Sequence, residues 1–304
     1  MNDRVITIDT ENGSAAKPAD ILITVFGATG MLAVPVVKQF VKAGYKVRAF
    51  VRDEAKAKTL LPAEAEIFIG NLSNREDIAG ALAGADIAYL NLSVEQNSHE
   101  RDFQSERDGL DIILQEARRK KIKRIVYLSS IIKDFDDTKW WANDMRRRAV
   151  QETEGSGIPF TIFMPSTFME CFPQLYLQNG VLMLPGKPKV PNWFIAAEDY
   201  ARQVTASLQL PSAANRKYFV QGPEPMQLDA AMELFKATYK PASLKIMRVP
   251  LWVLRFPALF VQKFDYLVRI QTALNNYKEE FWAADTWKEL GKPTITLKSF
   301  TEKL

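Results

Sequence analysis

The chain has 304 residues, of which 47 % are hydrophobic and 25 % are charged, a composition typical of a globular protein with room for one large domain and an added lobe. Its net charge of +4 is too small to indicate binding to nucleic acid. The single cysteine, Cys171, excludes an internal disulfide bond and suits a reducing compartment, so we expect a cytoplasmic protein.

Residues 1–20 are polar and carry acidic side chains at positions 3, 9, 11 and 20, which is unlike a secretory or transit peptide. We expect them to form a mobile leader ahead of the fold. No stretch offers about 18 uninterrupted apolar residues. The sequence therefore predicts neither a spanning helix nor a membrane partner.

Residues 21–40, ILITVFGATGMLAVPVVKQF, predict a strand, a glycine turn and a helix in that order. Residues 21–26 form a short β-branched run, and beyond Gly27 and Gly30 the apolar residues recur at helical spacing. Such a turn lets the backbone approach a pyrophosphate, which free N–H groups at the helix N-terminus can bind. Ala33, third in the glycine pattern, is small enough for close packing of helix on strand. The stretch predicts a dinucleotide site.

Residues 46–51 predict the second strand, and its tip indicates which dinucleotide binds. Enzymes that use NAD usually place a carboxylate there, against the ribose 2′-hydroxyl. Here Arg52 occupies the tip and Lys56 follows, and these cations suit the 2′-phosphate of NADP. We expect NADP(H), with NAD(H) less favoured, although Asp53 lies between the two cations. The alternative is a solvated charge cluster at the start of a helix.

Two further strands, at residues 66–69 and 86–90, each end in a polar loop. The loop Gly70-Asn71-Leu72 lies where adenine sits if the sheet binds a dinucleotide. The loop Asn91-Leu92-Ser93 would pass beside the pyrophosphate and the nicotinamide ribose.

Residues 102–120 predict one long amphipathic helix, with Phe103, Leu110, Ile113 and Leu114 on its inner face. His99, just before it, is the only histidine and has no partner at metal-ligand spacing, so we expect no metal site.

Residues 122–128 and 159–164 predict the fifth and sixth strands, with a helix over about residues 139–154 between them. Residues 217–220 predict a last strand. Strands that alternate with helices in this way indicate an α/β fold with a parallel, doubly wound sheet.

Beyond residue 165 the alternation loosens, and prolines indicate that loops dominate residues 166–193. We predict a dinucleotide-binding domain at residues 21–165 with 194–222, and a lobe for a substrate or partner at residues 166–193 with 223–304. The longest predominantly apolar run, residues 249–261, contains two prolines and Arg255. We interpret it as a lobe helix that packs on the core rather than as a membrane contact.

Residues 23–53, ITVFGATGMLAVPVVKQFVKAGYKVRAFVRD, resemble the opening of the NmrA-like group of atypical short-chain dehydrogenases/reductases, which bind NAD(P). The Gly70-Asn71-Leu72 loop and the segments IKRIVYLSS, SGIPFTIFMPSTFMECF and LGKPTITLKSF also fit this group. The likeness spans residues 21 to about 300 and is strongest in the first 165.

The resemblance implies a Rossmann domain with strand order 3-2-1-4-5-6-7 and a smaller C-terminal lobe over the nicotinamide end. The residues that it places at the pyrophosphate are Gly27, Thr29, Gly30, Met31 and Leu32. Arg52 and Lys56 match the positions that hold the 2′-phosphate in NADP-binding members. The loop that closes over the nicotinamide is matched by Pro165, Ser166, Thr167 and Phe168.

One departure from the group's pattern concerns catalysis. Active short-chain dehydrogenases use a Tyr-x-x-x-Lys pair on the helix after the fifth strand, and counting back from Gly157 puts Ala142 and Arg146 at those positions. Arginine stays protonated, so Arg146 can hold a ribose or a phosphate but cannot act as a base. The catalytic residues are therefore unknown, and Ser130 and Arg146 are candidates by position alone.

Two function classes follow. The first is an NADPH-dependent reductase of a small apolar or aromatic acceptor such as a quinone, since hydride transfer to an electron-poor acceptor can draw its proton from water. The second is a non-catalytic NADP(H) redox sensor that regulates a protein partner, as the regulator members of the group do. A sugar-nucleotide epimerase or dehydratase is disfavoured because that chemistry needs the missing pair. Either a monomer or a homodimer fits the sequence.

Overall fold

The computed structural model describes residues 17–135, 140–188 and 190–304. Most of the predicted leader, residues 1–20, therefore lies outside the described residues. Within the described ranges, no helix has both the length and the apolar character that crossing a bilayer requires.

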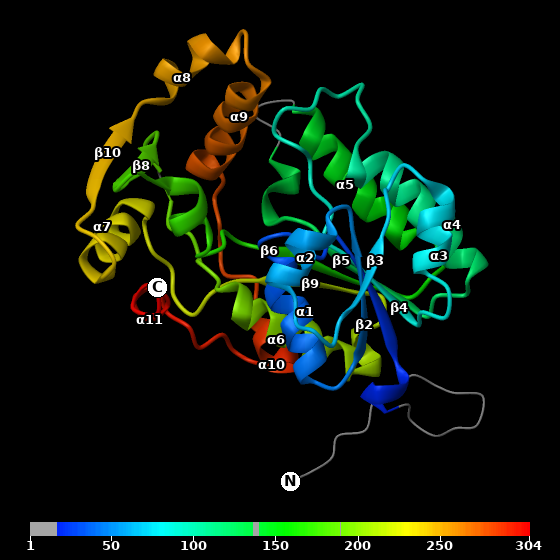
Figure 1. The fold of residues 1–304 in the computed structure, drawn as a ribbon. Helices are drawn as coiled ribbons and strands as arrows, with labels where there is room; N and C mark the ends of the chain where they lie inside the picture. The colour runs from blue at the N-terminus through cyan, green and yellow to red at the C-terminus, as the bar shows by residue number, and fades with distance from the viewer. Residues whose placement is uncertain (1–16, 136–139, 189) are drawn as a thin grey trace.

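In the described part of the chain, a seven-stranded parallel sheet forms the centre of the molecule (Figure 1). Its strands, in spatial order, are β3 (Glu66–Ile69), β2 (Lys46–Val51), β1 (Leu22–Phe26), β4 (Ile87–Leu90), β5 (Arg124–Leu128), β6 (Phe160–Pro165) and β9 (Arg216–Val220). This order confirms the predicted arrangement 3-2-1-4-5-6-7, with β9 in the seventh place. The residues of β4 and β5 are all buried, as in strands covered on both faces.

Helices cover both faces of the sheet, as crossovers between parallel strands require. One face is covered by α1 (Ala33–Lys42), α6 (Ala197–Leu208) and the short helices α2 (Glu54–Leu60) and α10 (Ala284–Leu290). The other face is covered by α3 (Arg75–Ala81), α4 (Leu110–Arg119) and α5 (Trp141–Glu154). The α/β, doubly wound class predicted from the sequence is confirmed.

A smaller lobe lies beside the sheet and has its own apolar core (Figure 1). Its elements are β7 (Leu177–Gln178), β8 (Val181–Pro185), α7 (Leu228–Thr238), β10 (Lys245–Val249), α8 (Leu251–Ala258), α9 (Gln262–Asn276) and α11 (Leu297–Thr301). The described residues of the lobe include a three-stranded sheet in the order β10-β8-β7, which the sequence did not predict. These strands are short, and β10 pairs with β8 from a distant part of the chain, so local patterns do not reveal them.

The expectation that residues 249–261 pack on the core is wrong. α8 has no buried residue, and Trp252, Phe256 and Phe260 are 73 %, 71 % and 77 % exposed. α8 packs along α9, and Pro250 and Pro257 confine it to a short helix at the end of this hairpin. Its apolar character therefore belongs to the surface of the lobe.

The helix predicted at residues 102–120 is shorter and has an irregular start. A π-helical turn at Ser105–Gly109 precedes α4, and Phe103 lies outside both and is 45 % exposed, so its predicted place on the inner face is wrong. Leu110, Ile113 and Leu114 are buried as predicted. The π turn also buries Glu106, which is 3 % exposed.

A buried carboxylate joins the sheet to the lobe. Glu279, between α9 and α10, accepts hydrogen bonds from the Ser166 hydroxyl at 2.8 Å, from Asn192 Nδ2 at 3.3 Å and from Gln221 Nε2 at 2.7 Å. Because Ser166 follows β6 and Gln221 follows β9, this carboxylate ties two strand ends to the lobe. Burial raises the pKa of Glu279, and the hydrogen bonds offset part of the rise.

Glu279→Gln should flatten the pH dependence of stability. Because folding raises the pKa of Glu279 above its ordinary 4.5, its contribution to stability is fully present below that value and is lost as the pH rises through the raised pKa. We expect the Tm of the wild type to fall relative to that of the variant as the pH rises from about 4.5 through the raised pKa. Glu224→Gln, an exposed control, should keep the wild-type profile. Parallel profiles for Glu279→Gln and the wild type would contradict this account.

Candidate cofactor-binding site

The predicted site residues lie along the edge of the sheet where its parallel strands end. The loop after β1 carries Gly27, Thr29, Gly30, Met31 and Leu32; Arg52 and Lys56 follow β2; Gly70, Asn71 and Leu72 follow β3; Leu92 and Ser93 follow β4; and β6 ends at Pro165, before Ser166, Thr167 and Phe168. The carboxyl ends of parallel strands meet at one edge, which is where this fold class binds ligands. Their roles in binding stay predictions.

The loop between β1 and α1 lies so close to Asn91 that Gly27 has no room for a side chain, and Gly30 has room for one only if the Asn91 side chain moves. A Cβ on Gly27 would lie 2.3 Å from the backbone oxygen of Asn91, and φ of Gly27 is +73°. A Cβ on Gly30 would lie 2.5 Å from Asn91 Nδ2. This amide donates a hydrogen bond to the Gly27 carbonyl at 3.2 Å, which holds the loop after β4 against the turn.

The same loop presents free backbone donors. Within the described residues, the N–H groups of Met31 and Leu32 donate to no other protein group. α1 begins at Ala33, and no side chain caps its N-terminus. Unpaired N–H groups at the positive end of a helix dipole attract anions, so this turn can receive a pyrophosphate.

Arg52 lies just beyond β2 with its side chain 75 % exposed, and its Nη1 is 3.2 Å from Oε1 of Glu95. Glu95 belongs to the loop after β4, so the ion pair joins two loops at the edge of the sheet. An exposed ion pair contributes about 0–1 kcal/mol, which a phosphate dianion can outcompete.

The second predicted cation, Lys56, is exposed in the first turn of α2. Asp53 caps this helix, because its Oδ1 accepts the backbone N–H of Lys56 at 2.9 Å. Asp53, the carboxylate between the two predicted phosphate-binding cations, therefore has a role in the fold as the cap of α2.

Three of the predicted site residues have side chains that are buried or hydrogen-bonded within the protein. Leu92 and Phe168 are each 6 % exposed, and the Phe168 ring lies edge-on to Tyr200 at 5.5 Å. Ser166 donates its hydroxyl to Glu279. At these positions a cofactor would therefore contact main-chain atoms.

Arg146 is buried on α5 and is held on several sides. Its Nε lies 3.6 Å from Oε2 of Glu106, its Nη1 donates to Asn143 at 3.1 Å, and its guanidinium lies 5.5 Å from the centre of the Trp140 ring. Tyr127 donates its hydroxyl to the other oxygen of Glu106 at 2.8 Å. These contacts fix the orientation of the guanidinium.

Glu106 and Arg146 influence each other's pKa values. Burial raises the pKa of Glu106, and Arg146 offsets part of that rise. Burial is the largest single influence on the pKa of Arg146 and acts to lower it, but Glu106, Tyr266 and Tyr127 together outweigh burial, so the net shift is upward and Arg146 stays cationic. Sequence reasoning missed Glu106, although its spacing from Leu110 places it on the apolar stripe of the helix.

The other positions considered for catalysis carry little chemistry. Ser130 accepts the N–H of Ile132 at 3.4 Å and so caps the short turn at Ile131–Asp134, and Ala142 is fully buried. Residues 136–139, just before α5, lie outside the described residues. In the part of the chain that the structure describes, no three His, Cys, Asp or Glu side chains are grouped so as to hold a metal ion.

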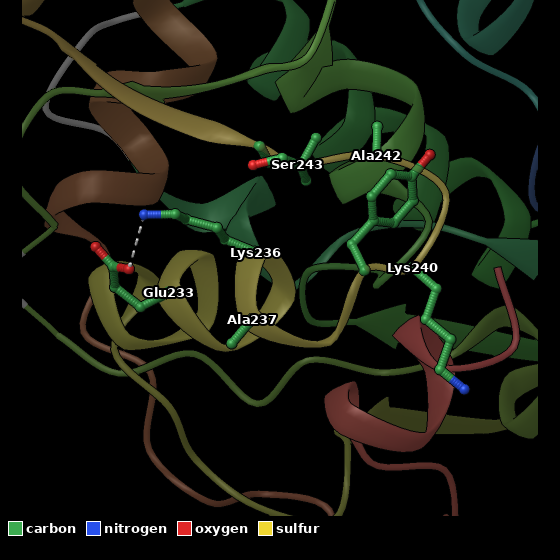
Figure 2. Close-up of a pocket in the computed structure, with 8 residues that line it drawn as sticks. Glu233, Lys236, Ala237, Lys240, Ala242 and Ser243 are labelled. Atoms are coloured by element: carbon green, nitrogen blue, oxygen red, sulfur yellow. Dashed lines mark ion pairs between the residues drawn. The ribbon is translucent and has the colours of Figure 1, made fainter.

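A surface cavity of about 420 Å³ lies elsewhere, in the lobe (Figure 2). The end of α7 and the loop after it line the cavity, and Figure 2 shows Lys236 pointing toward Glu233, with which it pairs at 3.9 Å. No predicted site residue lines this cavity. It is therefore separate from the strand ends at which we place the cofactor.

The model of the NmrA-like family matches residues 19–297. The chain belongs to the NmrA-like family. The resemblance of its sequence motifs to that group is thereby confirmed, and the match includes both the sheet and the lobe.

Of two relatives of this NmrA-like chain, one is named as an assembly factor and the other as an enzyme. Photosystem II assembly factor Ycf39 of Trieres chinensis is 24 % identical over 252 residues, which cover 80 % of this chain and 77 % of the relative. NAD(P)H azoreductase of Xenophilus azovorans is 25 % identical over 229 residues, which cover 72 % of this chain and 75 % of the relative.

A solved structure shares the NmrA-like chain's fold over nearly its whole length. The NADPH-dependent quinone oxidoreductase QOR2 of Escherichia coli, complexed with NADPH, superposes with a TM-score of 0.72 at 19 % identity. The match covers 92 % of this chain and 99 % of that one.

The contact of Asn91 with the two glycines predicts a selective rescue. Gly30→Ala should destabilise the protein by about 1–3 kcal/mol, because the new methyl group meets the Asn91 side chain. Adding Asn91→Ala should restore part of this loss, whereas it should not rescue Gly27→Ala, whose methyl group meets a backbone oxygen. Urea unfolding of the three single and two double variants measures these energies. Equal rescue of both glycine variants would contradict the geometry.

Proposed function

We propose that this NmrA-like protein binds NADP(H) and reduces a small apolar or aromatic acceptor, with a quinone the leading candidate. The observation that carries the proposal is the uncapped N-terminus of α1, which lies at the same edge of the sheet as the exposed cation of Arg52. The first suits a pyrophosphate and the second a 2′-phosphate. Similarity to an NAD(P)H azoreductase, and in fold to a quinone oxidoreductase complexed with NADPH, supports the proposal.

In this proposal, the loops at successive strand ends each bind a different part of the cofactor. The N–H groups of Met31 and Leu32 hold the pyrophosphate, and Arg52 and Lys56 hold the 2′-phosphate after Glu95 is displaced. The Gly70-Asn71-Leu72 loop lies beside the adenine, and the backbone of residues 165–168 lies beside the nicotinamide. Arg146 provides a fixed positive charge on α5.

The source of the proton limits the choice of acceptor. When bound, NADPH supplies a hydride, and a quinone takes up that hydride and one proton to become a hydroquinone. Ala142 and Arg146, at the positions matched to the usual tyrosine and lysine, cannot donate this proton at neutral pH. We infer that water donates it, which restricts the acceptor to one electron-poor enough to need no acid from the protein.

One observation favours a second function, a redox sensor without turnover. The position of Arg146, which a lysine occupies in active short-chain dehydrogenases, holds a cation that lies against Glu106 and over the ring of Trp140. Such a protein would bind NADP(H) and signal its redox state to a protein partner. The relative named as an assembly factor is consistent with a role of this kind.

Charge reversal at Arg52 tests the choice of cofactor. The wild type should bind NADPH at least about tenfold more tightly than NADH, because a lost charge-assisted hydrogen bond costs about 1.5–3 kcal/mol. Arg52→Glu should abolish this preference, whereas Glu95→Gln should raise the NADPH affinity by up to about fivefold, since Arg52 is then free. Fluorescence titration of each variant with both nucleotides gives the affinities.

The control for this titration is Lys46→Glu, the same reversal of charge at the opposite end of β2, where the residue is exposed. It should keep the wild-type preference. Equal affinity of the wild type for NADPH and NADH would remove the role given to Arg52.

Turnover separates the two functions. We expect NADPH oxidation with electron-poor quinones, measured as loss of absorbance at the nicotinamide band, and no oxidation with simple aldehydes or ketones, whose reduction needs a proton donor. Tight NADPH binding without turnover with any quinone would favour the sensor over the reductase.

A further inference from the structure

The outer end of the α8–α9 hairpin carries an exposed apolar surface that the proposed function does not use. We call it the α8 surface; its principal residues are Trp252, Phe256, Leu259 and Phe260, which are 71–77 % exposed. Their spacing places them on one side of the hairpin, and the rings of Phe256 and Phe260 meet edge to face at 5.7 Å. In Figure 1, α8 lies at the far end of the lobe from the seven-stranded sheet.

The hairpin is fixed in the fold at one end only. On α9, Tyr266 packs on Trp140 with ring centres 5.1 Å apart, and Ile270 packs against two buried clusters. α8, by contrast, has no buried residue. Exposed aromatic surface this concentrated marks a site of interaction with a protein or a membrane.

The stretch of chain that carries the α8 surface contains more cationic than acidic residues. Residues 241–270 contain five Lys or Arg residues and one acidic residue, Asp265. Arg269 pairs with Asp265, and Arg248 pairs with Asp229. The remaining three cations, Lys245, Arg255 and Lys263, are exposed, and within the described residues they form no ion pair.

Exposed aromatic residues together with unpaired cations suit an anionic bilayer better than a second copy of this chain. Aromatic and aliphatic side chains flanked by Lys and Arg are typical of helices that lie in the interface of an anionic bilayer. A two-fold contact between two copies would instead pair the α8 surface with itself and bring Arg255 and Lys263 toward the same cations of the second copy. Charge complementarity therefore favours anionic lipid.

We propose that the α8 surface inserts into the interface of an anionic lipid bilayer and binds the protein peripherally to membranes. The aromatic rings enter the boundary of headgroups and acyl chains, about 5–10 Å deep, and Lys245, Arg255 and Lys263 contact lipid phosphates. This proposal replaces the expectation, from the sequence, of no membrane partner at residues 249–261.

Flotation with vesicles of phosphatidylcholine, either alone or mixed with phosphatidylglycerol, tests the proposal on the full-length protein. We expect binding to the mixed vesicles that weakens with added salt. Combined Trp252→Ser, Phe256→Ser and Phe260→Ser should lower this partitioning at least about tenfold. Combined Arg255→Glu and Lys263→Glu should abolish the preference for mixed over neutral vesicles.

Because α8 has no buried residue, these variants should keep the wild-type Tm and NADPH affinity, so loss of vesicle binding reports on this surface and not on the cofactor site. Leu304→Ser, which removes exposed apolar area at the chain end, should bind vesicles as the wild type does. Failure of the wild type to bind mixed vesicles, or equal binding by the triple serine variant, would overturn the proposal. Self-association that the triple variant abolishes, without vesicle binding, would also overturn it and assign the surface to a second copy.

Discussion

The close contact between the β1–α1 loop and Asn91 is the constraint on which the candidate site depends. It requires glycine at position 27, leaves room for a side chain at position 30 only if Asn91 moves, and joins the ends of the adjacent strands β1 and β4. The turn then enters α1 without a side-chain cap, so that backbone N–H groups at the carboxyl edge of the sheet stay unpaired. Packing and the proposed binding of the pyrophosphate thus depend on the same few atoms.

Two arginines show how environment assigns different tasks to one side chain. Arg52 is exposed and pairs weakly with Glu95, so its charge is available to a phosphate. Arg146 is buried and engaged by Glu106, Asn143 and Trp140, so its charge is fixed in place. A mobile cation suits ligand capture, whereas an immobilised one suits the organisation of a pocket.

Local patterns predicted what depends on local physics. The apolar run before Gly27, the helical spacing after it and the repeated alternation of strands and helices identified the doubly wound sheet. The small sheet of the lobe was missed because β8 and β10 meet only through tertiary packing. Glu106 was missed because a carboxylate in a helix is expected to face solvent unless a buried partner is known, and its partner, Arg146, lies on another helix. The exposure of α8 likewise depends on what the rest of the chain leaves uncovered.

A crystal structure of the protein with NADPH would test the central claim most directly. The account predicts the pyrophosphate against the N–H groups of Met31 and Leu32, and the 2′-phosphate on Arg52 with the contact to Glu95 broken. A pyrophosphate bound away from the β1–α1 loop, or a 2′-phosphate facing solvent while Arg52 remains on Glu95, would contradict it.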